Sequence, residues 1–237
     1  MYRNLLLYVI LFSLFAQSCS TDDEVAVISE TEQATQDDTA IVNYLAKYYF
    51  QANTGKVKAF DSTITTDDNY TPLSQIAVKL PSGVWYAQNP EVTANGVSVS
   101  SSYDKKLLMN YDMYIFISSK NDDGTISYGS PNSPYISTLT SGTAKWDNNF
   151  YLHTLSATEV TNGVTESYYE MPGLQEGLKY FKTTERTVSD IPIFQGVIVV
   201  PSRLVYGRNS NYLGFNSTTT YVANPCVIFN FEILNQQ

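Results

Sequence analysis

The 237-residue chain has few of the side chains that bind metals, form disulfides or contact nucleic acids. It contains one histidine, His153, and two cysteines, Cys19 and Cys226. These numbers exclude a histidine-cysteine metal site and a disulfide framework. Lysine and arginine number 14 against 23 aspartates and glutamates, which gives a net charge of −9. Because phosphate contacts need a basic face, we expect no nucleic acid partner.

The chain also lacks the motifs of several common catalytic sites. A Ser-His-Asp triad could use His153, but no G-x-S-x-G elbow accompanies it, which favours a structural or surface histidine. No glycine-rich phosphate loop is present. The sequence NDDG at 121–124 is similar to part of a calcium loop, but the first and twelfth ligand positions would fall on Ser119 and Ser130. We therefore expect a hairpin turn there, and neither a metal nor a cofactor.

The first residues have the pattern of a secretory signal. Arg3 precedes an apolar run over 5–15 that is too short to span a bilayer as a mature helix. The sequence FAQSCS that follows resembles a bacterial lipobox, although Ala16 stands where leucine or another aliphatic residue is usual. We therefore predict a signal peptide over residues 1–18 and lipidation of Cys19. The alternative is an ordinary signal peptide with a chance cysteine.

A polar, acidic stretch follows the first cysteine. The sequence STDDE directly after Cys19 resembles the acidic runs of surface-exported lipoproteins of the Bacteroidota. Residues 19–36 are expected to form a solvated tether, because they are too polar to bury a core. Together with the lipobox, this predicts an outer membrane lipoprotein on the periplasmic or cell-surface side.

Residues 37–80 are expected to form an N-terminal helical extension. Asp38 is the candidate N-cap, and the sequence Asn-Thr-Gly at 53–55 is the candidate stop. Between them, apolar residues recur at helical spacing. These are Ile41, Leu45 and Tyr48.

Beyond residue 80, short runs of Val, Ile, Thr and Tyr broken by Asn, Asp, Gly and Pro indicate an antiparallel sheet. The clearest strand candidates are 84–88, 113–118, 197–200 and 226–234. In the last of these, apolar residues at 227, 229, 231 and 233 alternate with Ile228, Asn230 and Glu232. We expect the first face of this strand to be buried and the second to be wetter.

A short helix is predicted within the sequence EMPGLQEGLKYFK. Pro172 suits the first turn of a helix, where its missing N–H would have no partner, and Gly173 permits a close approach. Leu174, Leu178 and Phe181 follow as one apolar stripe. The pattern predicts a helix that lies on the antiparallel sheet of an α+β domain.

Three motifs in this part of the chain resemble those of the FKBP-type peptidyl-prolyl cis-trans isomerases. MPGLQEGLKYF, VIVVPSRLVYG and NPCVIFNFEIL occur in the order in which that family has its helix start, its PPELAYG-like segment and its last strand. Weaker similarity extends to SGVWYAQ at 82–88 and MYIFISSKNDDGT at 113–125. The helix ahead of these motifs looks like the N-terminal extension of secreted Bacteroidota members.

The resemblance implies an α+β fold, in which an FKBP-like curved antiparallel β-sheet is wrapped on a short α-helix and preceded by an N-terminal helix. The FKBP-like domain would span residues 81–237. It would carry inserts near 129–165 and 185–195.

The resemblance also implies a set of site residues. Met171 falls where the family has the apolar residue whose backbone N–H holds the substrate carbonyl, and Leu174 replaces the tryptophan of the pocket floor. Tyr206 matches the tyrosine whose hydroxyl binds peptide or macrolide. Tyr221 falls near an aliphatic wall position, and Phe229 matches the aromatic wall on the last strand.

The chain departs from the family pattern at other pocket positions. The family's strand tyrosine would fall at Ile117 or Ser118, and its Phe-Asp pair at Ser127 and Tyr128, so neither is present. Within the long insert that follows, Trp146-Asp147 is the candidate for a displaced aromatic-acid pair.

The implied activity needs no nucleophile, metal or cofactor. A dry aromatic pocket with donors on the neighbouring carbonyl favours the twisted X–Pro amide over the planar one. We expect a lipid-anchored isomerase or folding chaperone, with proline-containing peptides or exported proteins as partners. One alternative is a catalytically weak or inactive peptide-binding or structural module of the same fold. The other is a surface glycan-binding lipoprotein, suggested by 19 tyrosines and two tryptophans.

Overall fold

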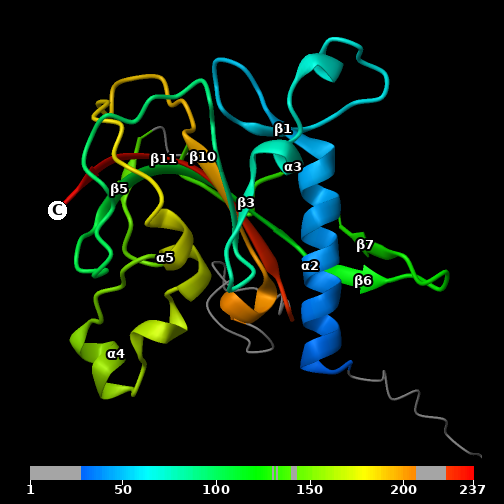
Figure 1. Cartoon of the computed structure of the whole chain (residues 1–237). Helices are drawn as coiled ribbons and strands as arrows, with labels where there is room; N and C mark the ends of the chain where they lie inside the picture. Colours follow the sequence, from blue (N-terminus) through cyan, green and yellow to red (C-terminus); the bar gives the residue numbers. More distant parts are fainter. Residues whose placement is uncertain (1–27, 130, 132, 140–142, 207–222) are drawn as a thin grey trace, which may run out of the picture.

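The structure is a computed structural model that describes residues 28–129, 131, 133–139, 143–206 and 223–237 (Figure 1). At its centre lies a curved sheet of seven strands in the order β3-β4-β10-β11-β5-β8, in which β9 also pairs with β5. Every pairing in this sheet is antiparallel. Its strands are β3 (Val78–Lys79), β4 (Trp85–Gln88), β5 (Leu107–Phe116), β8 (Ile136–Ser137), β9 (Lys145–Trp146), β10 (Gly196–Val200) and β11 (Cys226–Gln236).

In the part of the chain that the structure describes, two small hairpins and four helices surround this sheet. The hairpins are β1 (Tyr48–Phe50) with β2 (Val57–Ala59), and β6 (Ser118–Lys120) with β7 (Ile126–Tyr128). The helices are α2 (Glu30–Lys47), α3 (Leu73–Ile76), α4 (Ala157–Thr161) and α5 (Pro172–Leu178). Short 3₁₀ turns occupy Asp67–Asn69, Glu166–Tyr168 and Ser202–Leu204. The predicted architecture, an antiparallel sheet with a short helix and an N-terminal helix ahead of it, is confirmed.

Helix α5 covers one face of the sheet, as its apolar stripe predicts. Leu174 and Leu178 are fully buried in one core cluster with Ile198 of β10 and Phe229 of β11. A Cβ atom at Gly173 would lie 2.3 Å from Cγ1 of Val200. The helix can therefore approach the sheet this closely only because residue 173 is a glycine.

Helix α2 covers the opposite face. Ile41 and Tyr44 on the helix form a second core cluster with Val197 and Val199 of β10 and Ile228 of β11. The residues of β10 and β11 alternate between the two clusters, because successive side chains of a strand point to opposite faces. The expectation that the second face of 226–234 is wetter is therefore wrong, since Asn230 and Glu232 are each only 1% exposed.

The boundaries of α2 also differ from the prediction. The helix begins at Glu30 with Ser29 as its N-cap, so the second half of the expected tether is helical. It ends at Lys47, and residues 53–55 form the turn between β1 and β2 instead. Asp38 is not a cap, and Asp37 lies inside the helix with no exposed surface. Hydrophobic periodicity did not predict the first half of α2, because the side chains that this half buries, including Gln33 and Gln36, are polar.

The buried Asp37 carboxylate ties α2 to two distant segments. It accepts hydrogen bonds from the Ser118 hydroxyl at 2.6 Å and from the Gln33 amide at 2.8 Å. It also accepts two bonds from Ser202, one from the backbone N–H at 3.1 Å and one from the hydroxyl at 2.5 Å. Cys226 is buried beside this network, and burial together with the nearby Asp37 charge raises the pKa of its thiol. A raised pKa leaves little of the reactive thiolate, which indicates a structural cysteine.

The four strand candidates are confirmed as β4, β5, β10 and β11, with ends that shift by at most two residues except at the start of β5, which lies six residues earlier than predicted. The sequence NDDG forms the predicted hairpin turn, in which Asn121 and Thr125 share a backbone hydrogen bond and Gly124 has φ +82°. The segment predicted as an N-terminal extension contributes β3 to the main sheet. Among the residues that the structure describes, no helix has the length and apolar character needed to cross a membrane.

Candidate functional site

The structure brings four of the residues assigned by resemblance into one buried group, which we call the aromatic cup. Met171 precedes α5 as its N-cap and Leu174 lies in its first turns. Tyr206 follows the 3₁₀ turn at 202–204, and Phe229 lies on the central strand β11. All four belong to the core cluster under α5, and Tyr206, at 5%, is the most exposed of them. The aromatic wall of the cup is formed by Tyr111 stacked on Phe229, with ring centroids 4.7 Å apart.

The other predicted site residues fall outside this group or outside the described residues. Tyr221 and Cys19 lie outside the described residues. Trp146 is 37% exposed on the edge strand β9. The buried Asp147 carboxylate accepts hydrogen bonds from the backbone N–H groups of residues 150–152, and the shortest of these bonds is 2.8 Å, from Tyr151. Burial raises the pKa of Asp147, and these N–H groups partly offset that rise. Asp147 therefore shapes a local turn and does not pair with Trp146 in the cup.

Both donors that the resemblance assigns to a substrate are occupied by carbonyl groups of the chain itself. The backbone N–H of Met171 donates to the carbonyl of Phe150 at 2.8 Å. The Tyr206 hydroxyl donates to the carbonyl of Tyr169. The two acceptors lie near the two ends of one stretch that begins inside the long insert and continues to the start of α5. We call residues 147–170 the closing segment.

The first part of the closing segment packs into the core. Phe150 and Tyr151 are fully buried in the same cluster as the cup. The Phe150 ring meets Tyr111 edge-on at 6.3 Å, and Tyr111 in turn stacks on Phe229. Gln175 of α5 donates to the Tyr151 carbonyl at 2.7 Å. The insert therefore adds an aromatic ring to the wall of the cup.

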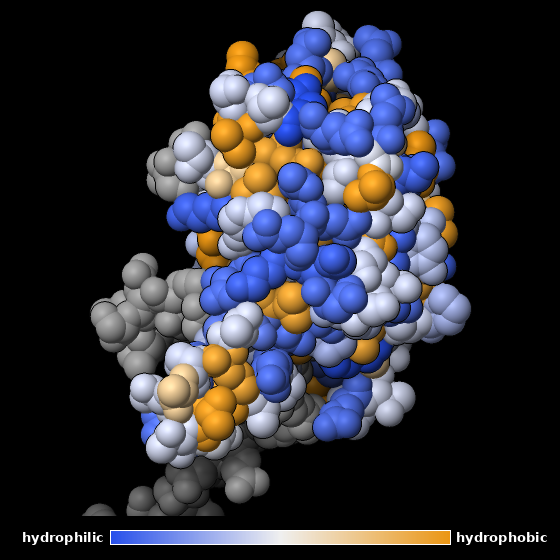
Figure 2. Space-filling view, turned by 90° about the vertical axis from the view of Figure 1, so that its left-hand side faces the viewer, coloured by the Kyte–Doolittle hydropathy of each residue, from blue (hydrophilic) through white to orange (hydrophobic). Residues whose placement is uncertain are grey.

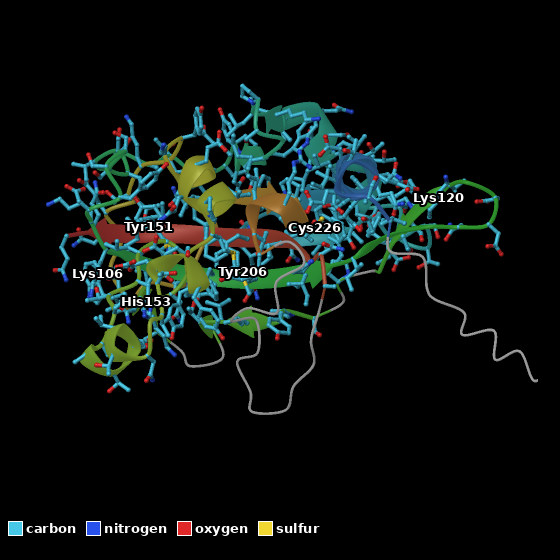
Figure 3. All side chains as sticks on the ribbon, turned by 90° about the horizontal axis from the view of Figure 1, so that it is seen from below. Lys106, Lys120, Tyr151, His153, Tyr206 and Cys226 are labelled. Atoms are coloured by element: carbon cyan, nitrogen blue, oxygen red, sulfur yellow. The ribbon has the colours of Figure 1, made fainter. Side chains whose placement is uncertain are left out.

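The second part of the segment folds back on itself through three side chains, which we call the clasp: His153, Glu159 and Tyr169. The Tyr169 hydroxyl donates to Glu159, and the His153 ring stacks on the Tyr169 ring at 3.7 Å. Nε2 of His153 lies 3.4 Å from Oε1 of Glu159. The bonds from Tyr169 and Ser156 lower the pKa of Glu159 to about 2, so it is ionised at neutral pH. Figure 3 shows His153 at the far end of the molecule from Lys120.

The sequence patterns did not predict that the closing segment takes part in the site, although two signals were present. The adjacent aromatics at 150–151 and 168–169 are unusual in a polar insert, and large aromatic side chains bury most of their surface. Ser156 and Glu159 have the spacing of a capping box, and the structure forms both of its hydrogen bonds at the start of α4. These signals indicate burial and the start of a helix, but they do not indicate that the segment packs against the cup.

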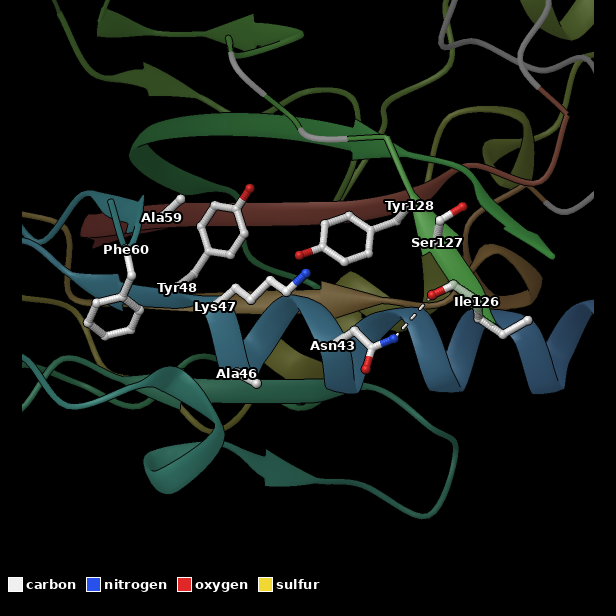
Figure 4. A pocket seen from close by; sticks show the side chains of 9 residues that line it. All are labelled: Asn43, Ala46, Lys47, Tyr48, Ala59, Phe60, Ile126, Ser127 and Tyr128. Atoms are coloured by element: carbon white, nitrogen blue, oxygen red, sulfur yellow. Dashed lines mark hydrogen bonds between the residues drawn. The ribbon is translucent and has the colours of Figure 1, made fainter. Parts of the chain in front are cut away.

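A cavity of about 410 Å³ lies on the other face of the molecule, between α2, β2 and β7 (Figure 4). Nζ of Lys47 lies 5.9 Å from the centroid of the Tyr128 ring. Burial, helped by the neighbouring Tyr48, raises the pKa of Tyr128 to about 12, so its hydroxyl stays protonated. Asn43 of α2 donates to the Ile126 carbonyl and fixes β7 to the helix. The lining residues are Asn43, Ala46, Lys47, Tyr48, Ala59, Phe60, Ile126, Ser127 and Tyr128.

The described residues contain no group of three or more His, Cys, Asp or Glu side chains that could hold a metal ion.

On the side shown in Figure 2, hydrophobic residues occur in small groups among hydrophilic ones. The exposed apolar residues of the closing segment include Val160, which is 60% exposed.

No family model matches the chain, and no curated protein matches it. The solved structures to which the chain is similar include three that are each less than 20% identical to it. One is FkpA from Escherichia coli, at 18% identity and TM-score 0.39 over 68% of this chain and 51% of that one. Another is a peptidyl-prolyl cis-trans isomerase from Pseudomonas syringae pv. tomato, at 11% identity and TM-score 0.41 over 89% and 98%. A third is a multi-domain immunophilin from Arabidopsis thaliana, at 12% identity and TM-score 0.36 over 68% and 45%. The chain thus spans about half the length of FkpA.

Proposed function

We propose that this chain is a lipid-anchored peptidyl-prolyl cis-trans isomerase or folding chaperone for exported proteins. The observation that supports this proposal is the pair of donors in the aromatic cup. The Met171 N–H and the Tyr206 hydroxyl each hold a peptide carbonyl, and both residues belong to the buried core cluster that contains Phe229. Recognition of the carbonyls that flank a proline needs donors of this kind in a dry apolar site.

The cup's residues would act on the X–Pro bond without forming a covalent intermediate. The barrier to rotation is ~18–20 kcal/mol and arises from amide resonance, which a twisted amide loses. Leu174 and Phe229 would hold the pyrrolidine ring away from water. The Met171 N–H and the Tyr206 hydroxyl would fix the carbonyls on either side of the bond, so that binding energy favours the twisted geometry. No metal or cofactor takes part in this scheme.

The first test is an X–Pro exchange assay by NMR on the soluble chain from residue 20 onward, beside Tyr206→Phe. The substitution removes one hydroxyl and keeps the buried ring. We expect the wild type to accelerate exchange, and the variant to lose about tenfold of that acceleration, which corresponds to ~1.4 kcal/mol of lost stabilisation. The matched control is Tyr180→Phe, at a half-exposed tyrosine that stacks on Tyr86. This control should keep the wild-type rate.

The alternatives give different results in the same assay. A catalytically inactive module of the same fold would bind proline peptides through Tyr206 without accelerating exchange. The specific observation in its favour is that both donors are already occupied within the chain. Glycan binding would be indifferent to Tyr206→Phe. It would instead depend on the cavity around Lys47 and Tyr128, so polysaccharide affinity that Tyr128→Ala abolishes would support that class.

The membrane anchor is tested separately in cells. We expect Cys19→Ser to prevent incorporation of labelled palmitate and to release the protein from the membrane fraction, because no other acylated residue would hold it there. Cys226→Ser is the matched control, since it removes the buried cysteine and leaves the lipobox intact. Palmitate labelling that survives Cys19→Ser would contradict the lipoprotein assignment.

A further inference from the structure

We propose that the closing segment, residues 147–170, is a built-in occupant of the aromatic cup that a client peptide must displace. This inference rests on the proposed function, because that function assigns the Met171 N–H and the Tyr206 hydroxyl to substrate carbonyls. Both donors are engaged by carbonyls of one segment, those of Phe150 and Tyr169. A client that uses these donors therefore competes with the segment.

The hydrogen bonds that the Met171 N–H and the Tyr206 hydroxyl make within the chain are of the kind that a bound peptide would make. Each is a hydrogen bond to a backbone carbonyl. The Phe150 ring, fully buried beside the Tyr111–Phe229 stack, supplies the apolar side chain. A peptide can exchange for the segment without leaving a buried donor unpaired, since one carbonyl replaces another. Leaving such a donor unpaired would cost about 1–3 kcal/mol, so direct replacement is the favoured route.

The middle of the segment has no described hydrogen bond to the body of the protein. Most residues between 154 and 167 are exposed. The hydrogen bonds described for these residues stay within the segment, as in the capping box of Ser156 and Glu159. The ties to the rest of the chain are concentrated at its two ends, at 147–151 and 169–170.

The clasp holds the second of these ends in place. Tyr169 carries the carbonyl that occupies Tyr206, and its side chain is fixed by the hydrogen bond to Glu159 and by the stack on His153. Loss of the clasp should therefore raise the fraction of molecules in which Tyr206 is free. The apparent affinity for a client is the intrinsic affinity multiplied by the fraction of open molecules, so this change should be visible as tighter binding.

The test compares Glu159→Ala and, separately, Tyr169→Phe with the wild type. The first removes the acceptor of the clasp and the second removes only its donor hydroxyl. Thr158→Ala is the matched control, at an exposed neighbour on α4. Two quantities are measured by NMR on the soluble chain: hydrogen exchange of the Met171 amide, and affinity for a proline-containing tetrapeptide. Far-UV circular dichroism verifies that each variant is folded.

We expect both clasp variants to exchange the Met171 amide faster, because Met171 lies two residues after Tyr169, which the clasp no longer holds. We also expect them to bind the tetrapeptide about tenfold more tightly than Thr158→Ala does. Adding Tyr206→Phe to Glu159→Ala should remove the gain in affinity. Faster exchange at Met171 without tighter binding would overturn the inference, because opening would then expose no site. Unchanged Met171 exchange in both variants would also overturn it. Tighter binding with no acceleration of X–Pro exchange in any variant would support the closing segment and count against the isomerase.

Discussion

Replacing Phe229 with alanine is expected to lower the free energy of unfolding by about 3–5 kcal/mol, the usual cost of removing a buried aromatic ring. The ring has no exposed surface, stacks on Tyr111 at 4.7 Å and lies 5.6 Å from Phe231. Its strand, β11, is paired on both sides, with β5 and with β10. A cavity at this position cannot be closed easily, because the surrounding backbone is held by two ladders of hydrogen bonds. Urea unfolding followed by circular dichroism measures the change.

Phe229→Leu is the matched control, since it keeps an apolar side chain and should cost clearly less than alanine. A cost for Phe229→Ala below that of Phe229→Leu would contradict the central position of the ring in the core. The prediction also affects how the site is tested. A loss of activity in Phe229→Ala would report partial unfolding as readily as a lost contact with substrate. Tyr206→Phe tests the cup more cleanly, because it removes one oxygen atom.

Asp37→Ala is expected to destabilise the protein by about 3 kcal/mol or more, since buried donors that lose a charged acceptor pay their full desolvation cost. The carboxylate receives hydrogen bonds from Gln33, Ser118 and Ser202, which belong to three different parts of the chain. Its removal leaves the backbone N–H of Ser202 without that acceptor. The measurement is again urea unfolding, together with hydrogen exchange of the Ser202 amide, which should become faster.

The neighbouring Asp38 provides a control that differs only in position. Its side chain is 33% exposed and pairs with Lys79 and Arg203 at 3.2 and 3.0 Å. Exposed ion pairs of this kind contribute about 0–1 kcal/mol, so Asp38→Ala should cost far less than Asp37→Ala. Equal costs for the two substitutions would show that the buried network does not anchor α2. Comparing the two substitutions also tests where α2 begins, because a helix with Asp38 as its N-cap would be destabilised more by Asp38→Ala than by Asp37→Ala.

Local patterns in the sequence were sufficient for several elements. Pro172, Gly173 and the stripe that begins at Leu174 predicted α5, because a helix start and an apolar face are encoded within a few residues. Period-two alternation predicted β11, and the sequence NDDG predicted the β6–β7 turn. The prediction was wrong for the first half of α2. Asp37 faces inward there because its partners at 118 and 202 are distant in sequence, and no local periodicity reports them.

For the candidate site, the motifs were sufficient to select residues that resemble a binding cup, and Met171, Leu174, Tyr206 and Phe229 lie in one core cluster. Packing between distant segments covers the second face of β11, where α2 lies on Ile228, the turn at 53–57 meets Asn230 and Arg186 pairs with Glu232. Such packing also occupies both donors of the cup. A strand's own residues show which of them share a face, but whether a helix far along the chain covers that face depends on long-range packing. Likewise, the acceptors that Met171 and Tyr206 meet are the backbone carbonyls of Phe150 and Tyr169. Every residue carries such a carbonyl, so the side-chain identity of an acceptor does not report the contact.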